Sequence, residues 1–207
     1  INVFLRKGTS DPLVFIEIFI DEVYKSDEHD VKINTIIDAG ANIGLTALYY
    51  SCILPNANIF ALEHGINNFN LLSKNTKQKY SIKPLNMALN DSAGFVKMSY
   101  TEAGKWGFKL ERREAGNVIS NKVVGLRMQT LIKNENIDTI DILKIDIEGA
   151  EKYILNYEAS YLTKTKFMFI ELHPNVNGSV ASFINCLKTY PPYYIKGKGE
   201  NLILKYL

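Results

Sequence analysis

The sequence predicts an α/β fold in which helices cover both faces of a doubly wound, mostly parallel sheet. Three apolar segments each end in an acid, at Asp38, Glu63 and Asp146. Segments of helical length follow these strands, which is the pattern of consecutive βαβ units. Residues 36–46 combine a strand, a tight turn of small residues and the first turn of a helix, the βα junction that such a sheet requires.

The elements can be placed in chain order within a single domain over residues 1–207. Residues 1–30 are expected to be an entry segment with a short strand near residues 3–5 and a helix over residues 12–25. Asp11 stands just before Pro12, so it is interpreted either as a helix cap or as a ligand-binding residue. In the core, residues 31–207, the predicted strands cover 35–38, 58–63, 82–88, 140–146 and 166–172, and the predicted helices cover 45–53, 67–79, 130–134 and 181–188.

Two regions depart from this alternation. Residues 94–100 and 123–128 are predicted to be added strands, and the charged, glycine-bearing residues 101–116 between them are predicted to be a loop. Near the end of the sequence, residues 197–201 are predicted to form a turn. This turn connects the segment after Pro192 to the apolar residues 202–207. We therefore expect a C-terminal antiparallel hairpin on an otherwise parallel sheet.

The composition excludes several classes of protein. A net charge of +2 over 207 residues, with no run of five like charges, argues against a nucleic-acid surface. The apolar run at 13–20 contains Glu17 and is far too short to span a bilayer. The two cysteines form no zinc motif, and there is no secretory signal pattern, so a cytoplasmic location is expected.

The turn after Asp38 points to a particular ligand. A dinucleotide fingerprint counted from Gly40 needs glycine at positions 42 and 45, but the chain has Asn42 and Leu45. The spacing that fits is Asp-x-Gly-x-Asn-x-Gly. Its acid suits the ammonium group of S-adenosylmethionine better than a pyrophosphate. The cofactor candidates here are therefore Asp38, Gly40, Ala41, Asn42 and Gly44; the competing interpretation is an ordinary strand-to-helix turn.

Two further acids complete the predicted cofactor site. Glu63 ends the next strand, 25 residues after Asp38, where an acid can accept hydrogen bonds from ribose hydroxyls; it could instead be an exposed strand-end residue. Its neighbour His64, and Met87 and Ala88 at the end of the strand predicted at 82–88, are also assigned to cofactor binding. Asp146 ends a strand that should be buried, at the sheet edge where ligands of doubly wound folds bind.

Four stretches of the chain, taken together, resemble one family: residues 5–11 (LRKGTSD), 37–44 (IDAGANIG), 143–151 (LKIDIEGAE) and 170–174 (IELHP). They are similar to FkbM-type methyltransferases, which are S-adenosylmethionine-dependent. The resemblance implies a Rossmann-like class I methyltransferase fold and methyl transfer, usually to oxygen, often on a sugar or a natural product. One departure is His64, since the family usually has proline after the ribose acid, and this puts the shape of the adenosine rim in question.

Methyl transfer to a hydroxyl also requires a group that takes up its proton. His173 follows a predicted strand and is the best-placed imidazole, although it could instead order the loop before Pro174. Asp146 and Glu148 are rival bases or acceptor ligands, and Glu148 could also be a helix-capping residue. Asp146, Glu148 and Glu171 could hold Mg²⁺, but no metal is assigned. Trp106 is a candidate platform for the acceptor, with Glu148, Glu171 and His173 as further acceptor-binding residues.

The leading prediction is an O-methyltransferase acting on a carbohydrate or a glycosylated natural product. Its partner is then a small-molecule or glycan acceptor, with no nucleic acid and no membrane insertion. Two alternatives remain open at this point. One is a nicotinamide-dependent oxidoreductase, against which Asn42 and Leu45 argue. The other is a module that binds the cofactor without catalysis.

Overall fold

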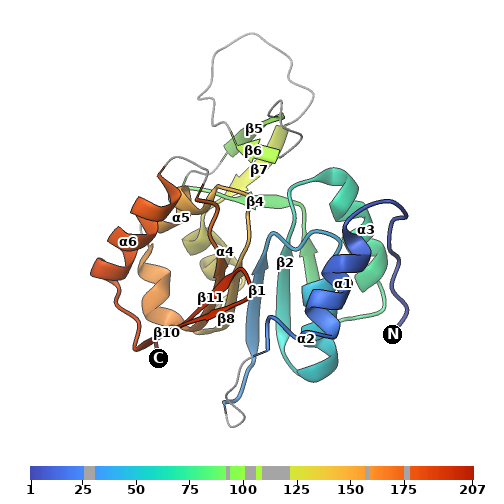
Figure 1. The fold of residues 1–207 in the computed structure, drawn as a ribbon, viewed down its shortest axis with the longest axis horizontal. Helices are drawn as coiled ribbons and strands as arrows, with labels where there is room; N and C mark the ends of the chain where they lie inside the picture. Colours follow the sequence, from blue (N-terminus) through green and yellow to red (C-terminus); the bar gives the residue numbers. More distant parts are fainter. Residues whose placement is uncertain (26–30, 92–93, 101–105, 109–121, 157–158, 175–177) are drawn as a thin grey trace.

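A computed structural model describes residues 1–25, 31–91, 94–100, 106–108, 122–156, 159–174 and 178–207. Its main feature is a seven-stranded sheet in the order β10-β11-β9-β8-β1-β2-β3 (Figure 1). The strands are β1 Thr35–Ala39, β2 Asn58–Leu62, β3 Ile82–Leu85, β8 Ile140–Ile145, β9 Thr165–Glu171, β10 Tyr194–Lys198 and β11 Asn201–Lys205. All pairs are parallel except β11 with β9 and with β10. The predicted fold class and C-terminal hairpin are therefore confirmed.

Helices pack on both faces of this sheet. One face carries α1 Asp11–Phe19, α2 Leu45–Ile53 and α3 Ile66–Thr76; the other carries α4 Met128–Asn134, α5 Glu151–Asn156 and α6 Ser179–Thr189 (Figure 1). The 3-10 helix Ala159–Lys164 precedes β9. Successive side chains of β1 point to opposite faces, so Ile36 packs with α1 and α2 while Ile37 packs with α4 and α5. The apolar character of both residues follows from burial on both faces.

A smaller sheet, in the order β4-β7-β5-β6, corrects two predictions. The expected strand at 82–88 is two strands, because Asn86 leaves the sheet and its side-chain amide donates to the carbonyls of Glu63 and His64. β4 Met87–Leu89 then pairs with β7 Lys122–Leu126, which pairs with β5 Gly94–Tyr100. Part of the loop expected at 101–116 is also a strand, β6 Trp106–Phe108; the remaining residues of that loop lie outside the described part.

The entry segment differs from its prediction as well. The strand expected at residues 3–5 does not form, because Phe4 bonds through its backbone N–H and carbonyl to the side chain of Asn75. The helix α1 ends at Phe19, well before residue 25, and Glu22 then takes a positive φ of 50°. This early end lets the following chain, including Tyr24, turn back toward the sheet.

The order of the strands creates a crevice at one place. From β1 the strand order runs in one direction to β2 and β3. On the other side of β1 lies β8, and from β8 the order runs in the opposite direction to β9. Ligands of doubly wound sheets bind outside the carboxyl ends of the strands at such a reversal. The residues after β1, β2, β8 and β9 therefore converge on a common site.

Candidate active site

The turn between β1 and α2 is built from positive-φ residues. Gly40 has φ +80°, Asn42 +49° and Gly44 +89°. A Cβ on Gly40 would lie 1.7 Å from the backbone oxygen of Asp146, so only glycine permits this approach of the β1 turn to the end of β8. The N–H groups of Gly40 and Ala41 donate to the Leu62 carbonyl at 3.0 and 2.8 Å. The turn is therefore fixed between the ends of β2 and β8.

Glu63 lies directly against this turn. It is 4% exposed, and its two carboxylate oxygens accept hydrogen bonds from the N–H groups of Asn42 (2.9 Å) and Gly65 (2.6 Å). Burial raises the pKa of Glu63 to about 7, and the two N–H donors oppose that rise. Burial also lowers the pKa of the neighbouring His64 to about 4, so this imidazole is neutral at pH 7. Met87 and Ala88 lie in β4, which contacts β2.

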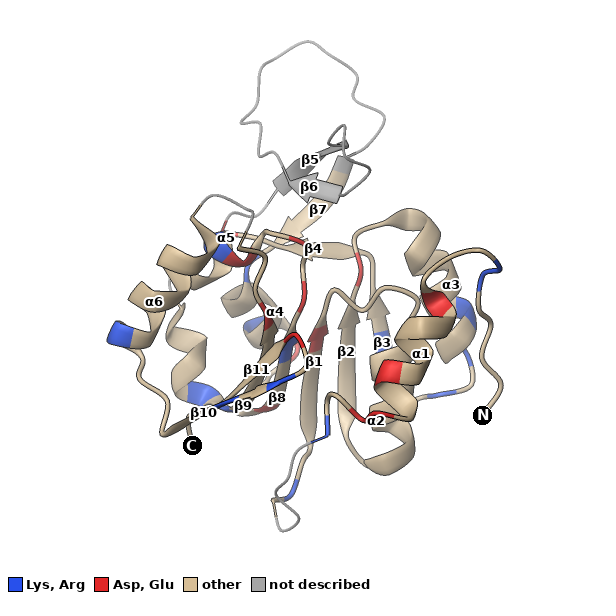
Figure 2. Ribbon diagram, viewed as in Figure 1, with Lys and Arg blue, Asp and Glu red and all other residues tan. Residues whose placement is uncertain are grey.

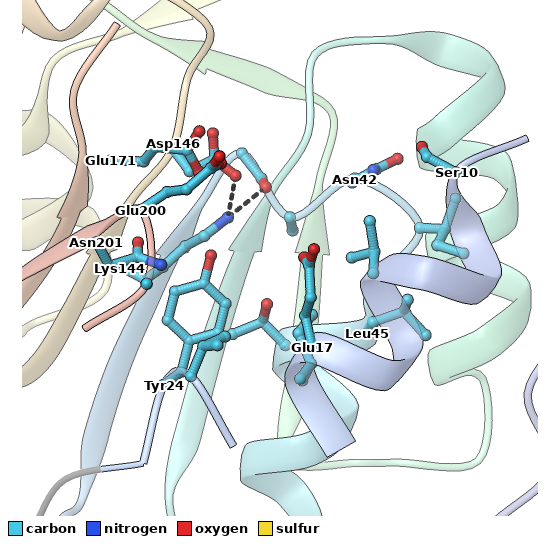
Figure 3. A pocket seen from close by; sticks show the side chains of 18 of the residues that line it. Ser10, Glu17, Tyr24, Asn42, Leu45, Lys144, Asp146, Glu171, Glu200 and Asn201 are labelled. Carbon is cyan, nitrogen blue, oxygen red and sulfur yellow. Dashed lines mark hydrogen bonds and ion pairs between the residues drawn. The ribbon is translucent and has the colours of Figure 1, made fainter. Parts of the chain in front are cut away.

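A cavity of about 480 Å³ opens at the switch point (Figure 3). Its wall is formed by α1, the turn after β1, the ends of β8 and β9, and the turn between β10 and β11. Among the described residues that line the cavity, the charged ones are mostly acidic: Glu17, Asp21, Asp146, Glu148, Glu171 and Glu200, with Lys144 as the one cation. In Figure 2, red segments of the ribbon lie near the ends of the central strands. Among the predicted cofactor residues, Gly40, Ala41, Asn42 and Asp146 line the cavity.

Lys144 is a site residue that the sequence predictions did not include. It is 3% exposed, and its Nζ lies 3.4 Å from Asp38 Oδ1 and 3.3 Å from Asp146 Oδ2, and donates to the Gly40 carbonyl at 2.7 Å. Burial alone would lower the pKa of Lys144, but the carboxylates of Asp146 and Asp38 outweigh it and the pKa is raised. A lysine in the middle of the apolar strand 140–145 was the available signal, because a buried lysine needs a carboxylate partner.

Asp38 does not lie on the wall of the cavity, where an acid would have to be to bind the ammonium group of a ligand directly. It is fully buried, it is not among the residues that line the cavity, and the cation it faces is Lys144. Burial raises the pKa of Asp38, and Lys144 opposes that rise. Any action of Asp38 on a ligand is therefore transmitted through Lys144.

His173 is held by a buried carboxylate. Its Nδ1 lies 2.9 Å from Oε1 of Glu151, a residue with no solvent exposure that also accepts hydrogen bonds from the Gly149 N–H and the Ser179 hydroxyl. The hydrogen bond to Glu151 raises the pKa of His173 to about 9. The other ring nitrogen, Nε2, faces Glu148 at 3.5 Å and Glu171 at 3.6 Å.

Three residues at the ends of β8 and β9 come together here, and we call them the strand-end cluster: Asp146, Glu171 and His173. One side-chain N or O atom from each lies within 4.8 Å of the others. Burial, reinforced by the charge of Asp146, raises the pKa of Glu171 to about 7. Glu148 borders the cluster with a positive φ of 52°, an uncommon conformation for a non-glycine residue that is often found at functional sites.

Tyr24 is a second residue that the sequence predictions missed. It is 6% exposed and lines the cavity, and its hydroxyl points toward Lys144 and the ends of the strands (Figure 3). Within the described part of the chain no hydrogen bond to this hydroxyl is found. No periodicity signals such a role, because Tyr24 follows α1 in an irregular segment.

The sequence suggested two other residues for ligand binding, Asp11 and Trp106, and of these Asp11 does not line the cavity. Asp11 is 1% exposed and accepts hydrogen bonds from the backbone N–H, Nε and Nη2 of Arg6, whose Nη1 reaches Asn68. Its role is to fix the entry segment against α3. Trp106 lies in β6, and its side chain is outside the described part of the structure.

Residues 38–188 match the family described as the Methyltransferase FkbM domain. The chain belongs to the FkbM methyltransferase family. The match begins at Asp38 and includes the glycine turn, Glu63 and the strand-end cluster.

Two curated relatives support the assignment. This FkbM-family chain is 28% identical over 174 residues to the methyltransferase sdnD of Sordaria araneosa, covering 69% of the chain and 66% of sdnD. It is 25% identical over 164 residues to the hexuronic acid methyltransferase AglP of Haloferax volcanii, covering 78% of the chain and 62% of AglP. The chain thus spans slightly less than two thirds of each relative.

Solved structures with low sequence identity share the fold. A methyltransferase FkbM from Methylobacillus flagellatus superposes with a TM-score of 0.60 at 13% identity, covering 93% of this chain and 48% of that one. A precorrin-6y C5,15-methyltransferase from Geobacter metallireducens gives 0.52 at 12% identity, covering 99% and 94%. Among the described residues of the FkbM-family chain, no helix is long and apolar enough to cross a bilayer.

Proposed function

We propose that this FkbM-family protein is an S-adenosylmethionine-dependent methyltransferase that methylates a hydroxyl oxygen on a carbohydrate or a glycosylated natural product. The observation that carries the cofactor proposal is the position of Glu63. This buried acid is fixed by the N–H of Asn42 against the glycine turn, at the end of the strand next to β1. An acid at that position in a βαβ unit accepts hydrogen bonds from ribose hydroxyls. AglP, a relative named as a hexuronic acid methyltransferase, supports a sugar as the acceptor.

The cofactor would be held by the turn and by the strand ends on both sides of it. We assign the ribose to Glu63, with His64, Met87 and Ala88 beside the adenine, and the methionine part to the turn and Asp146. The turn residues in this set are Gly40, Ala41, Asn42 and Gly44. Asp38 contributes indirectly, because it holds Lys144 against the Gly40 carbonyl and Asp146.

The strand-end cluster would activate the acceptor. The donor supplies an electrophilic methyl group on a sulfonium. Transfer to the acceptor oxygen would leave the electron pair of the broken carbon–sulfur bond on sulfur, and the protein would take up the hydroxyl proton. Without a bound cation, the hydrogen bond to Glu151 keeps His173 protonated at neutral pH, so the hydroxyl proton of the acceptor passes to a carboxylate beside His173. His173 and Asp146 then act by orienting the hydroxyl and balancing charge, and the cavity aligns donor and acceptor.

Two experiments test this proposal. S-adenosylhomocysteine should raise the melting temperature of the protein, since a ligand that prefers the native state stabilises it, whereas NADH should not. Absence of a shift at millimolar S-adenosylhomocysteine in folded protein would contradict the cofactor assignment. Radiolabelled methyl transfer should then be screened over neutral sugars, uronic acids and glycosylated natural products, with the product site mapped by mass spectrometry. Cofactor binding without transfer to any of these acceptors would favour a non-catalytic module.

A further inference from the structure

The strand-end cluster has the composition of a metal site as well as that of a proton acceptor. We propose that Asp146, Glu171 and His173 bind one divalent cation of the Mn²⁺ or Mg²⁺ type at the wall of the cavity. The role of the ion in activating the acceptor hydroxyl rests on the proposed function.

The three ligands are brought together by the sheet. Asp146 directly follows β8, Glu171 ends β9, and His173 comes two residues later, while β8 and β9 are parallel neighbours in register. Their ligand atoms lie within 4.8 Å of one another. Ligands of an octahedral ion with bonds of about 2.1 Å are roughly 3–4 Å apart. Rotation of the partly buried carboxylates of Asp146 and Glu171 would bring the ligand atoms closer to that spacing.

The orientation of His173 is typical of a metal ligand. Metal-binding histidines almost always donate their other ring N–H to a carboxylate or a carbonyl, which fixes the tautomer. Here Glu151 binds Nδ1 at 2.9 Å and is itself fixed by Gly149 and Ser179. Nε2 is consequently directed at the carboxylates of Glu171 and Glu148. An imidazole nitrogen fixed in this way among carboxylates can bind a cation once it has lost its proton.

Lys144 leaves room for such an ion. Its Nζ lies 3.3 Å from Oδ2 of Asp146 and donates to the Gly40 carbonyl from the buried side of the cavity (Figure 3). It therefore fixes the Asp146 carboxylate through one oxygen. No ion pair is found between Lys144 and Glu171 within the described part of the chain. The charge of Lys144 is shared between Asp146 and the buried Asp38, so it offsets only part of the negative charge of the cluster.

Tyr24 gives a second, independent indication of a ligand at this place. Its side chain is more than nine-tenths buried, yet its hydroxyl opens on the cavity on the side of Lys144 and Asp146 without a hydrogen-bond partner among the described residues (Figure 3). A phenol hydroxyl that opens on a cavity can donate a hydrogen bond to a ligand there, or accept one from it. A cation's water shell, or an acceptor hydroxyl bound to the cation, would be such a partner.

The donor set indicates the class of ion and its use. Two carboxylates suit Mg²⁺ and Mn²⁺, and the imidazole favours Mn²⁺ of the two. Three protein ligands leave coordination positions open for hydroxyls of the acceptor. A bound cation lowers the pKa of a coordinated hydroxyl, so the oxygen can attack the methyl group at neutral pH. The proton released goes to Glu148, which borders the site and is not one of the three ligands.

Binding of Mn²⁺ alone tests the site without relying on activity. Electron paramagnetic resonance of Mn²⁺ added to the folded protein should show one bound ion, which Mg²⁺ displaces. Glu171→Gln and His173→Gln should each weaken Mn²⁺ binding at least about tenfold, as should Glu151→Gln, since outer-shell changes typically cost about 10–100-fold in metal affinity. The matched control is Glu17→Gln, which removes a cavity acid outside the cluster and should leave Mn²⁺ affinity unchanged.

The outcomes separate this proposal from the proposed function. S-adenosylhomocysteine binding, measured on every variant, shows that the variant is folded and that its cofactor site is intact. A wild-type protein that binds S-adenosylhomocysteine but no Mn²⁺ or Mg²⁺ overturns the metal site and leaves the proposed function standing. Equal weakening by Glu17→Gln and Glu171→Gln shows diffuse charge attraction and also overturns it. Mn²⁺ binding without S-adenosylhomocysteine binding supports the site and contradicts the proposed function.

Discussion

The ammonium of Lys144 lies 3.4 Å from an oxygen of Asp38, and both side chains are almost completely shielded from solvent. The two residues are direct neighbours in the pairing of β1 with β8. Removing both charges from water is costly, so each charge depends on the other and on the hydrogen bond from Lys144 to the Gly40 carbonyl. This pair joins the two central strands where the ligand crevice opens.

The first prediction concerns that pair. Lys144→Met leaves the Asp38 carboxylate buried without its cation, and we expect the free energy of unfolding in urea to fall by about 3–5 kcal/mol. The double variant Lys144→Met/Asp38→Asn should recover much of this loss, because it removes the buried charge. If the losses of unfolding free energy in Lys144→Met and Asp38→Asn add up to the loss in the double variant, Lys144 and Asp38 do not stabilise one another.

The second prediction is steric. Gly40→Ala places a Cβ 1.7 Å from the Asp146 carbonyl oxygen, so the turn must separate from the end of β8. We expect a lower melting temperature and loss of S-adenosylhomocysteine binding, followed by thermal denaturation and calorimetry. Gly8→Ala is the matched control: Gly8 also has a positive φ, of 76°, but nothing lies within 4 Å of its Cβ position. Equal effects of the two substitutions would mean that backbone strain, not the close approach to Asp146, is responsible.

The third prediction concerns pH and Glu63. Its pKa is about 7 in the folded protein, above its ordinary value, because it is buried. The native state therefore binds the proton more tightly than the unfolded state, and the contribution of Glu63 to stability falls as the pH rises through 7. Ribose hydroxyls, by contrast, donate best to the ionised carboxylate. We expect calorimetry to show that S-adenosylhomocysteine affinity rises between pH 6 and pH 8.

Glu63→Gln provides the control for this prediction. The amide keeps the shape of the side chain but loses the charge, so affinity should fall by about 1–3 kcal/mol, the typical value for a hydrogen bond to a charged group. Affinity should also become independent of pH over the same interval. A wild-type pH dependence that persists in Glu63→Gln would assign it to another group.

The fourth prediction concerns His173. His173→Gln should reduce the turnover of methyl transfer by roughly 10²-fold, the loss that can follow when a reacting group is misplaced by about 1 Å. The affinity for S-adenosylhomocysteine should change little, because His173 does not line the turn. His64→Gln should show the opposite pattern, weaker cofactor binding with turnover largely retained at saturating cofactor. Nearly unchanged turnover in His173→Gln would remove the imidazole from the mechanism.

Local patterns in the sequence determined the repeated elements of this protein. The apolar strands that end at Asp38, Glu63 and Asp146 could be placed because both the apolar run and the terminal acid are encoded within a few residues. The turn at Gly40 could be placed because only certain residues fit its conformation. The same reasoning failed at residues 82–88, where the amide of Asn86 bonds to carbonyls more than 20 residues away and ends the strand.

Tertiary structure alone decided which of these residues meet. The acid at position 38 suggested an ammonium-binding group, but the pairing of β1 with β8 places Lys144 beside it. Glu151 was assigned no role from the sequence, yet in the structure its carboxylate is the hydrogen-bond partner of His173. Tyr24 gave no signal, since its position depends on where α1 ends. A sequence encodes the conformational preferences of neighbours, whereas burial, charge pairing and ligand geometry depend on contacts between residues that are far apart in the chain.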